Sequence, residues 1–188
     1  MLFRSLYTAN DFTFSGDASV SGTDAGTYDM ELVSTDFTNT NANFANVNFV
    51  IVDGQLTITP VAAEVTVTIT EHSGEYEYDG TEHTVTGYDV TSISNTLYTA
   101  NDFTFSGDAS VSGTDAGTYD MELVSTDFTN TNANFANVNF VIVDGQLTIT
   151  PVAAEVTVTI TEHSGEYEYD GTEHTVTGYD VTIPATAS

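Results

Sequence analysis

Hydrophobic and polar residues alternate with a period of two in several segments of the chain. Residues 65–70 read Val-Thr-Val-Thr-Ile-Thr, which places Val65, Val67 and Ile69 on one face of a strand. Residues 27–33 alternate in the same way. No segment repeats its apolar residues every 3.6 positions, which is the signature of an amphipathic helix. The pattern therefore predicts an all-β protein with one buried face per strand and no significant helix.

Turn signals separate the predicted strands. Asp53-Gly54 divides the apolar run over residues 48–59 and predicts a two-residue hairpin. Residues 75–88 read Glu-Tyr-Glu-Tyr-Asp-Gly-Thr-Glu-His-Thr-Val-Thr-Gly-Tyr, with a second such dipeptide at Asp79-Gly80. This stretch is rich in side chains that could do chemistry, but its spacing predicts mainly a second hairpin.

The chain contains one long repeat. Residues 6–91 return without a substitution as residues 97–182, so each position n carries the same residue as position n + 91. A period of this length is typical of a small domain and too long for a solenoid unit. Recent duplication and selection for a variable repeat number, as in a spacer, both account for the identity.

Several segments of the repeat resemble a known family. Residues 76–90, 12–32 and 48–60 are similar to the YDG-type and MBG-type repeat domains of large bacterial cell-surface proteins. The resemblance implies an extracellular location, tandem Ig-like, β-sandwich-like domains and a place in an adhesin-like stalk. It supplies no catalytic residues. Residues 24–28, Asp-Ala-Gly-Thr-Tyr, add an analogy to the tyrosine corner of Ig-like domains.

The family pattern also suggests where the domains divide. Its units close at a proline, which predicts that residues 1–60 are the C-terminal part of one domain, residues 61–151 a complete domain and residues 152–188 the N-terminal part of another. The alternative is two whole domains, residues 6–91 and 97–182. In the first division both outer parts expose apolar strand faces and need a partner. That partner is either the other end of the same chain or the end of the next chain. Because a complete domain between them makes it hard for the ends of one chain to meet, we expect head-to-tail self-association by strand addition, which propagates a filament.

The charge of the chain excludes some partners. There are 28 acidic residues and one basic residue, a formal net charge of −27. Such a chain repels nucleic acids and anionic membrane surfaces, because both are bound mainly through Lys and Arg. Direct membrane insertion is not expected either, since no apolar run approaches about 18 residues. Hydrophobic residues make up 40% of the chain, which is enough for a folded core.

The strongest candidates for a metal site are four Glu-His pairs. They are Glu71-His72, Glu82-His83, Glu162-His163 and Glu173-His174. Imidazole and carboxylate groups suit zinc, but adjacent residues of a strand point to opposite faces, so no pair chelates a metal by itself. Solvated side chains beside turns are the expected reading.

Calcium and catalysis are the remaining alternatives. Residues 21–29 and 39–48 are rich in carboxylate and amide oxygens but lack the spacing of a calcium loop, so we expect diffuse binding of divalent ions. No motif places a nucleophile beside a base, and an enzyme is not expected. We assign no catalytic, cofactor-binding or metal-binding residue. The predicted function is a structural stalk, spacer or filament module, and the alternative is an adhesion module that binds calcium or a glycan through acidic loops; its glycan or protein ligand is unknown.

Overall fold

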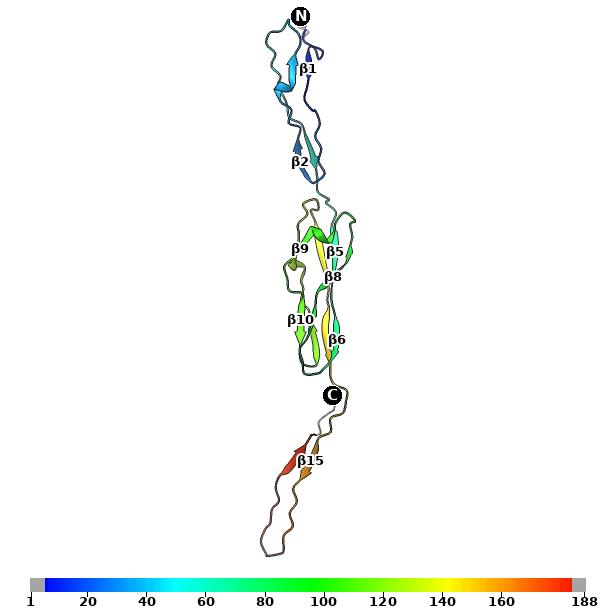
Figure 1. The fold of residues 1–188 in the computed structure, drawn as a ribbon, viewed down its shortest axis with the longest axis vertical. Helices are drawn as coiled ribbons and strands as arrows, with labels where there is room; N and C mark the ends of the chain where they lie inside the picture. The colour runs from blue at the N-terminus through cyan, green and yellow to red at the C-terminus, as the bar shows by residue number, and fades with distance from the viewer. Residues whose placement is uncertain (1–5, 184–188) are drawn as a thin grey trace.

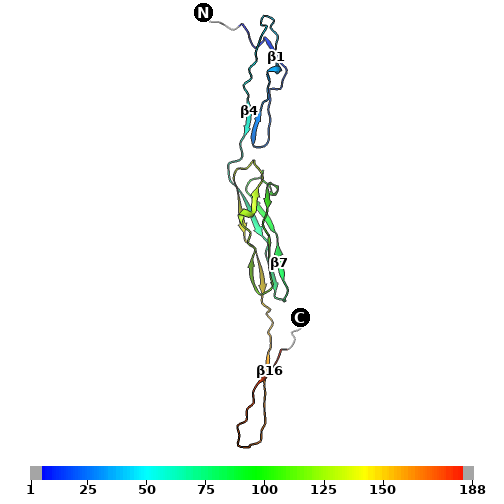
Figure 2. The ribbon, with the colours of Figure 1, turned by 90° about the vertical axis from the view of Figure 1, so that its left-hand side faces the viewer.

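A computed structural model describes residues 6–183, which form three bodies along one long axis (Figures 1 and 2). We call residues 6–60 the N-terminal segment, residues 61–151 the central unit and residues 152–183 the C-terminal hairpin. Strands and short 3₁₀ turns make up all the regular structure of these residues, which confirms the all-β prediction.

The strands are short and follow one another closely. Those of the N-terminal segment are β1 (Phe12–Phe14), β2 (Gly26–Asp29), β3 (Phe37–Asn39) and β4 (Gln55–Ile58). Those of the central unit are β5 (Val65–Glu71), β6 (Gly74–Glu77), β7 (His83–Thr86), β8 (Tyr88–Ile93), β9 (Phe103–Phe105), β10 (Ser110–Gly113), β11 (Gly117–Asp120), β12 (Phe128–Asn130), β13 (Val138–Val143) and β14 (Gln146–Thr150). The C-terminal hairpin contains β15 (Thr159–Glu162) and β16 (Tyr179–Thr182). The 3₁₀ turns are η1 (Ser34–Asp36), η2 (Ala100–Asp102) and η3 (Ser125–Asp127).

Two three-stranded sheets form most of the central unit. In one, β5 lies between β13, to which it is parallel, and β8, to which it is antiparallel. In the other, β14 lies between β11, which is antiparallel to it, and β6, which is parallel to it. Two strand pairs, β10 with β7 and β12 with β9, complete the unit. Strands from residues 65–93 thus pair with strands from residues 103–150.

The hydrophobic core lies in the central unit. Its buried residues are Val65, Val67, Ile69, Val85, Tyr98, Phe103, Met121, Leu123, Phe128, Phe135, Phe140, Leu147 and Ile149. The alternation predicted for β5 is confirmed, because its burial alternates along the whole strand and extends to Glu71. No hydrophobic side chain of the other described residues is fully buried.

Neither predicted hairpin forms. Residues 47–52 before Asp53-Gly54 form no strand, and β4 after it pairs with β2. At the copy of this turn, Asp144-Gly145, the flanking strands β13 and β14 lie in different sheets, and so do β6 and β7 on either side of Asp79-Gly80. The reason is that each strand finds a partner far away in the sequence. β5 pairs with β13 in parallel, and β6 pairs with β14 in parallel. The chain thus passes from one sheet to the other between β5 and β6, and again between β13 and β14.

The two end bodies share sequence with the central unit but form fewer strand pairs. The N-terminal segment has two separate pairs, β1 with β3 and β2 with β4, and the C-terminal hairpin has only β15 with β16. Residues 19–22 and 47–52, the copies of β10 and β13, form no strand. Residues 165–168 and 174–177, the copies of β6 and β7, form none either. Each of these segments lacks the partner that its copy has in the central unit.

Candidate functional site

The C-terminal hairpin exposes a face that the central unit buries. Val156 and Ile160 are 60% and 53% exposed, whereas their copies Val65 and Ile69 are 1% and 0% exposed. The cause is the missing second half of the core. In the central unit Val65 and Ile69 belong to a hydrophobic cluster whose other members come mostly from residues 98–149, and no such cluster forms on β15 among residues 6–183. The hairpin therefore carries an apolar strip of the kind that marks an interaction surface.

The N-terminal segment is open on the complementary side. Its copy of β13 forms no strand, and Val50 and Val52 in it are 77% and 90% exposed, against 40% and 45% for their copies Val141 and Val143. Leu56 and Ile58 on β4 are only partly buried, although their copies in β14 are fully buried. The aromatic rings of this segment already contact one another, for example Phe37 and Phe49 with centroids 5.6 Å apart. The segment is a partly formed core with one side uncovered.

Glu71 is the one charged side chain buried among the described residues, at 4% exposure. Its Oε1 accepts a hydrogen bond of 2.8 Å from the backbone N–H of Leu123. Its Oε2 accepts one of 2.7 Å from the backbone N–H of Gly145. A carboxylate can be buried when its oxygens are satisfied in this way. Through these two hydrogen bonds, Glu71 connects β5 to the segment that follows β11 and to the turn that precedes β14.

The equivalent groups at the two ends of the molecule are not joined. Leu32 and Gly54 are the copies of Leu123 and Gly145, and no described residue accepts a hydrogen bond from either backbone N–H. Glu162 is the copy of Glu71, and its exposed carboxylate accepts none from the described residues. The same three groups are therefore connected once in the central unit and left open at the ends.

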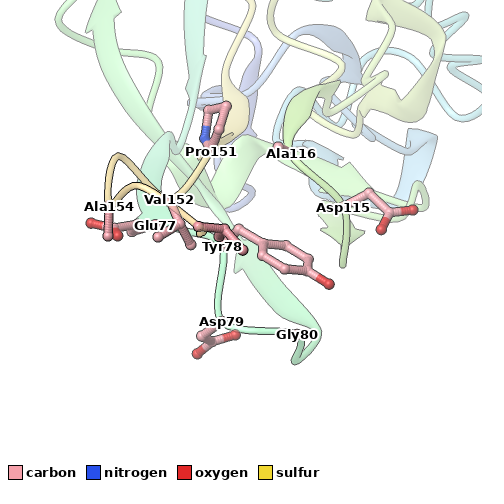
Figure 3. Close-up of a pocket in the computed structure, with 10 residues that line it drawn as sticks. Glu77, Tyr78, Asp79, Gly80, Asp115, Ala116, Pro151, Val152 and Ala154 are labelled. Atoms are coloured by element: carbon pink, nitrogen blue, oxygen red, sulfur yellow. The ribbon is translucent and has the colours of Figure 1, made fainter. Parts of the chain in front are cut away.

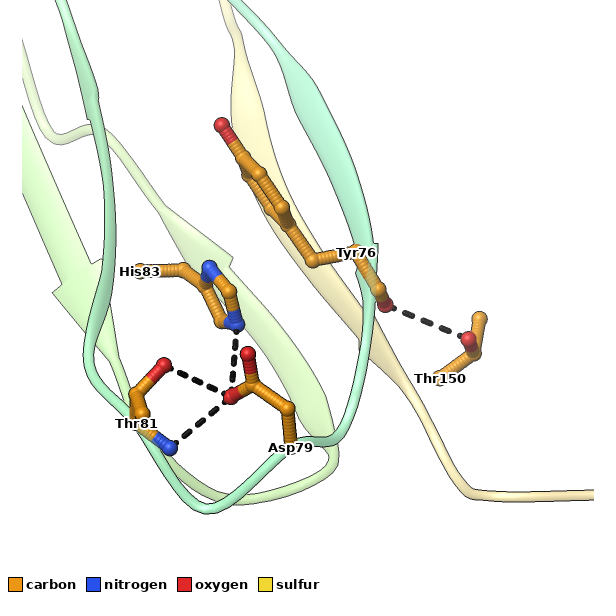
Figure 4. A network of polar contacts seen from close by, with 5 residues as sticks. All are labelled: Tyr76, Asp79, Thr81, His83 and Thr150. Atoms are coloured by element: carbon orange, nitrogen blue, oxygen red, sulfur yellow. Dashed lines mark hydrogen bonds and ion pairs between the residues drawn. The ribbon is translucent and has the colours of Figure 1, made fainter. Parts of the chain in front are cut away.

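The turn after β6 is held by its own side chains (Figure 4). The Asp79 carboxylate accepts hydrogen bonds from the Thr81 hydroxyl at 2.7 Å and the Thr81 backbone N–H at 2.8 Å, and these bonds lower the pKa of Asp79 below its ordinary value. The ring of His83 stacks on Tyr76 at 4.3 Å, and its Nε2 lies 3.1 Å from Asp79 Oδ1. Gly80 occupies the left-handed region at a φ of 79°, which favours glycine. These contacts stabilise a turn.

The Glu-His pairs point in different directions. His72 Nδ1 lies 2.8 Å from the Thr86 carbonyl oxygen and its Nε2 lies 3.3 Å from Asp89 Oδ2, at the surface. Glu71 beside it points into the core. Glu82 accepts a hydrogen bond from the hydroxyl of Ser112. Among residues 6–183, no group of three His, Asp or Glu side chains converges in a way that could hold a metal ion.

The asparagine-rich loop organises itself through its amide groups. Asn130 accepts hydrogen bonds from the Tyr98 hydroxyl at 3.0 Å and the Asn132 N–H at 3.0 Å, and donates one to the Phe135 carbonyl at 3.1 Å. Asn132 in turn donates to Asp102 at 2.8 Å. Hydrogen bonds from Thr99 are the main reason that the pKa of Asp102 is lowered. The same network recurs in the N-terminal segment, where Tyr7 donates to Asn39. These amide and carboxylate oxygens thus bond within the loop, and diffuse binding of divalent ions to this part of the chain stays a prediction.

The Asp-Ala-Gly-Thr-Tyr segments form tyrosine corners. The hydroxyl of Tyr28 donates to the Asp24 carbonyl oxygen at 2.8 Å, and that of Tyr119 donates to the Asp115 carbonyl oxygen at 3.0 Å. The corner forms in both copies because all its parts are local.

Comparison with protein families identifies the repeat. The model of the MBG domain family matches residues 3–60 and 65–151. The chain belongs to the MBG domain family. This confirms the resemblance inferred from the sequence. MBG domains are repeat modules of surface proteins and are not known as enzymes.

No match was found among the curated proteins or the solved structures. No helix among residues 6–183 is long and apolar enough to cross a membrane.

A specific contact joins the two MBG matches. Asn134 of the central unit accepts a hydrogen bond from the backbone N–H of Ala25 and donates one of 2.9 Å to the Asp24 carboxylate, both in the N-terminal segment. Val61, just after Pro60, forms a parallel bridge with Phe135 in the same loop. We call these contacts the Asn134 clasp.

The opposite end of the central MBG unit carries copies of the residues that Asn134 contacts in the N-terminal segment. A cleft of about 970 Å³ opens there beside Asp115 and Ala116, the copies of Asp24 and Ala25 (Figure 3). Pro151 and Val152, the copies of Pro60 and Val61, line its other side. No loop equivalent to that of Asn134 occupies this cleft among the described residues.

Proposed function

We propose that this chain is an extracellular structural module that acts as a stalk or spacer of a bacterial surface structure and joins further copies head to tail by strand complementation. One observation carries the proposal. The C-terminal hairpin and the N-terminal segment are copies of the two parts, residues 61–91 and 97–151, that together make the central unit.

The central unit supplies the register of such a joint. Val67 is paired with Phe140 in the parallel β5–β13 ladder, and Ile149 is paired with Tyr76 in the parallel β14–β6 ladder. The corresponding pairs between two chains are Val158 with Phe49 and Tyr167 with Ile58. The joint would give residues 47–52 the strand partner that they lack, and would cover the exposed side of Val156 and Ile160.

The arrangement of the bodies favours a linear product. The N-terminal segment and the C-terminal hairpin lie at opposite ends of the long axis (Figure 1). A contact between unlike ends need not close, so it adds copies along one direction. The cleft beside Asp115 would then receive the Asn43 loop of the next copy, because Asn43 is the copy of Asn134. Each joint between two copies would then contain the same contacts that the Asn134 clasp makes within one chain.

The charge of the chain opposes its own assembly. Copies with a formal net charge of −27 repel one another, and added salt screens that repulsion over about 10 Å at 0.1 M. We expect assembly to strengthen with sodium chloride, and magnesium and calcium to act alike. A saturable effect of calcium that magnesium does not reproduce would instead favour the calcium-binding alternative.

Light scattering across a wide range of protein concentration tests the proposal, with negative-stain images of the same samples. We expect particle mass to rise with concentration and the images to show unbranched filaments. Deleting residues 152–188 should abolish the rise and leave the N-terminal segment without its missing strands. A chain that stays at 20.1 kDa at high concentration and high salt would contradict head-to-tail assembly.

A further inference from the structure

We infer that Glu162 fixes the register of the joint between copies, by accepting hydrogen bonds from the backbone N–H groups of Leu32 and Gly54 of a second copy of this chain. The inference rests on the proposed head-to-tail assembly and adds the group that makes the joint specific. Glu71 shows the arrangement within one chain, with both carboxylate oxygens bonded to backbone N–H groups at 2.8 and 2.7 Å.

Hydrophobic pairing alone does not define this joint. Residues 156–161 read Val-Thr-Val-Thr-Ile-Thr, so a slip of two residues along the partner strand keeps every apolar side chain on the inner face. A slip moves Glu162 away from the backbone N–H groups of Leu32 and Gly54. The carboxylate would then be buried without partners, which is strongly unfavourable. Glu162 therefore penalises the registers that the valine and threonine pattern permits.

The donor groups come from two segments of the acceptor. Leu123 follows β11, and Gly145 precedes β14. Glu71 can accept both hydrogen bonds only when these two segments are correctly placed relative to β5. Leu32 and Gly54 hold the same places after β2 and before β4. A hydrogen bond also already joins the Met30 N–H to the Gly54 carbonyl, as Met121 is joined to Gly145. The Gly54 side of the acceptor is therefore already arranged as in the central unit. The Leu32 side is not, because Glu31 before it has a φ of 36° that its copy Glu122 does not share, so we expect this backbone to adjust when the joint closes.

Gly54 provides a second way to test the register, because its surroundings differ from those of its copy. A Cβ atom at Gly145 would lie 2.3 Å from the His72 carbonyl oxygen and 2.8 Å from the Glu71 carbonyl carbon, which is too close for any side chain. A Cβ atom at Gly54 would have nothing within 4 Å. An alanine at position 54 is thus tolerated while the joint is open and is excluded when it closes in the register of the central unit.

The first test compares Glu162→Gln with Glu166→Gln in the full chain. Both variants remove one negative charge from the hairpin, but Glu75, the copy of Glu166, is exposed in the central unit. Sedimentation at fixed salt gives the dissociation constant for the joint. We expect Glu162→Gln to raise it about tenfold or more, as expected for the loss of hydrogen bonds to a charged group. Glu166→Gln should lower it slightly or leave it unchanged, because repulsion between copies falls.

The second test uses Gly54→Ala, again in the full chain. We expect the dilute variant to have the circular dichroism and melting temperature of the unchanged protein, and to lose assembly at concentrations where the unchanged protein forms it. This readout separates a blocked joint from a misfolded chain.

The outcomes separate the two claims. If the unchanged chain assembles and Glu162→Gln assembles as well as Glu166→Gln, the role of Glu162 is overturned and the proposed function stands. Normal assembly of Gly54→Ala would likewise overturn the register while leaving head-to-tail joining intact. If the unchanged chain does not assemble at all, both claims fail.

Discussion

Residues 97–151 and residues 6–60 have the same sequence and different structures. In the central unit the first set contributes six strands and most of the buried core. In the N-terminal segment the same residues form four short strands and bury no hydrophobic side chain fully. The difference is residues 61–91, which lie against the first set and not against the second. Strand formation here follows the presence of a partner rather than local propensity.

The comparison extends to the other half of the domain. Residues 65–71 form a strand of full length beside β13, whereas their copies form β15 over residues 159–162 alone. Features that need no distant partner are equal in the two copies. Tyr167 stacks on His174 at 4.5 Å, as Tyr76 stacks on His83. The Asp170 carboxylate accepts a hydrogen bond from the Thr172 hydroxyl, as Asp79 does from Thr81. Local turns therefore form whether or not the sheets around them are complete.

The largest expected effect is a difference between Ile69→Ala and Ile160→Ala. Ile69 is fully buried, so its truncation should lower the free energy of unfolding of the central unit by about 2–5 kcal/mol. Ile160 is half exposed in the hairpin, and its truncation should change the stability of the dilute chain by less than about 0.5 kcal/mol. Thermal denaturation of both variants measures the difference. In assembled samples Ile160→Ala should weaken the joint, and equal effects of both substitutions in dilute solution would contradict the account.

A second prediction concerns the titration of the two equivalent tyrosines. Burial, and then the charge of Asp102, raise the pKa of Tyr98 to about 12. Burial and Asp11 raise the pKa of Tyr7 as well. Because the pKa of Tyr98 is higher in the folded chain than its value of about 10 in an unfolded one, its stabilising contribution is complete below pH 10 and is lost as pH rises toward 12. In an absorbance titration, Tyr98→Phe should remove the component near pH 12 and Tyr7→Phe should leave it. An equal partial reduction of that component in both variants would mean that the two environments are equal.

The smallest expected effect is that of Asn134→Ala. The substitution removes the two hydrogen bonds of the Asn134 clasp at the surface, so the melting temperature of the central unit should change little. The N-terminal segment should instead sample more orientations, which small-angle X-ray scattering would detect as a less extended particle. Asn43→Ala is the matched control, because its clasp forms only between copies. A dilute Asn43→Ala chain with the same loss of extension would contradict the assignment.

The sequence predicted those parts of the fold that depend on local pattern. The alternation over residues 65–70, the turn at Asp79-Gly80 and the tyrosine corner all appear as expected. The strand pairing was missed, because a glycine turn looks the same whether the flanking strands pair with each other or enter different sheets. Glu71 was placed among surface residues, yet it continues the inward positions 65, 67 and 69, and that period was the available signal. Its hydrogen-bond donors, Leu123 and Gly145, are too distant in the sequence for any local pattern to reveal.

Hydrogen exchange read by mass spectrometry tests most directly whether the two ends are halves of one domain. The peptide from residues 65–76 has the same sequence and mass as the peptide from residues 156–167, so both copies appear in one isotope envelope. In dilute samples we predict two components of equal size, a protected one from β5 and β6 and an exchanged one from the hairpin. At assembling concentrations the exchanged component should merge with the protected one as the filaments lengthen. An exchanged component that persists in assembled samples would show that the hairpin does not complete the N-terminal segment, and would contradict the account.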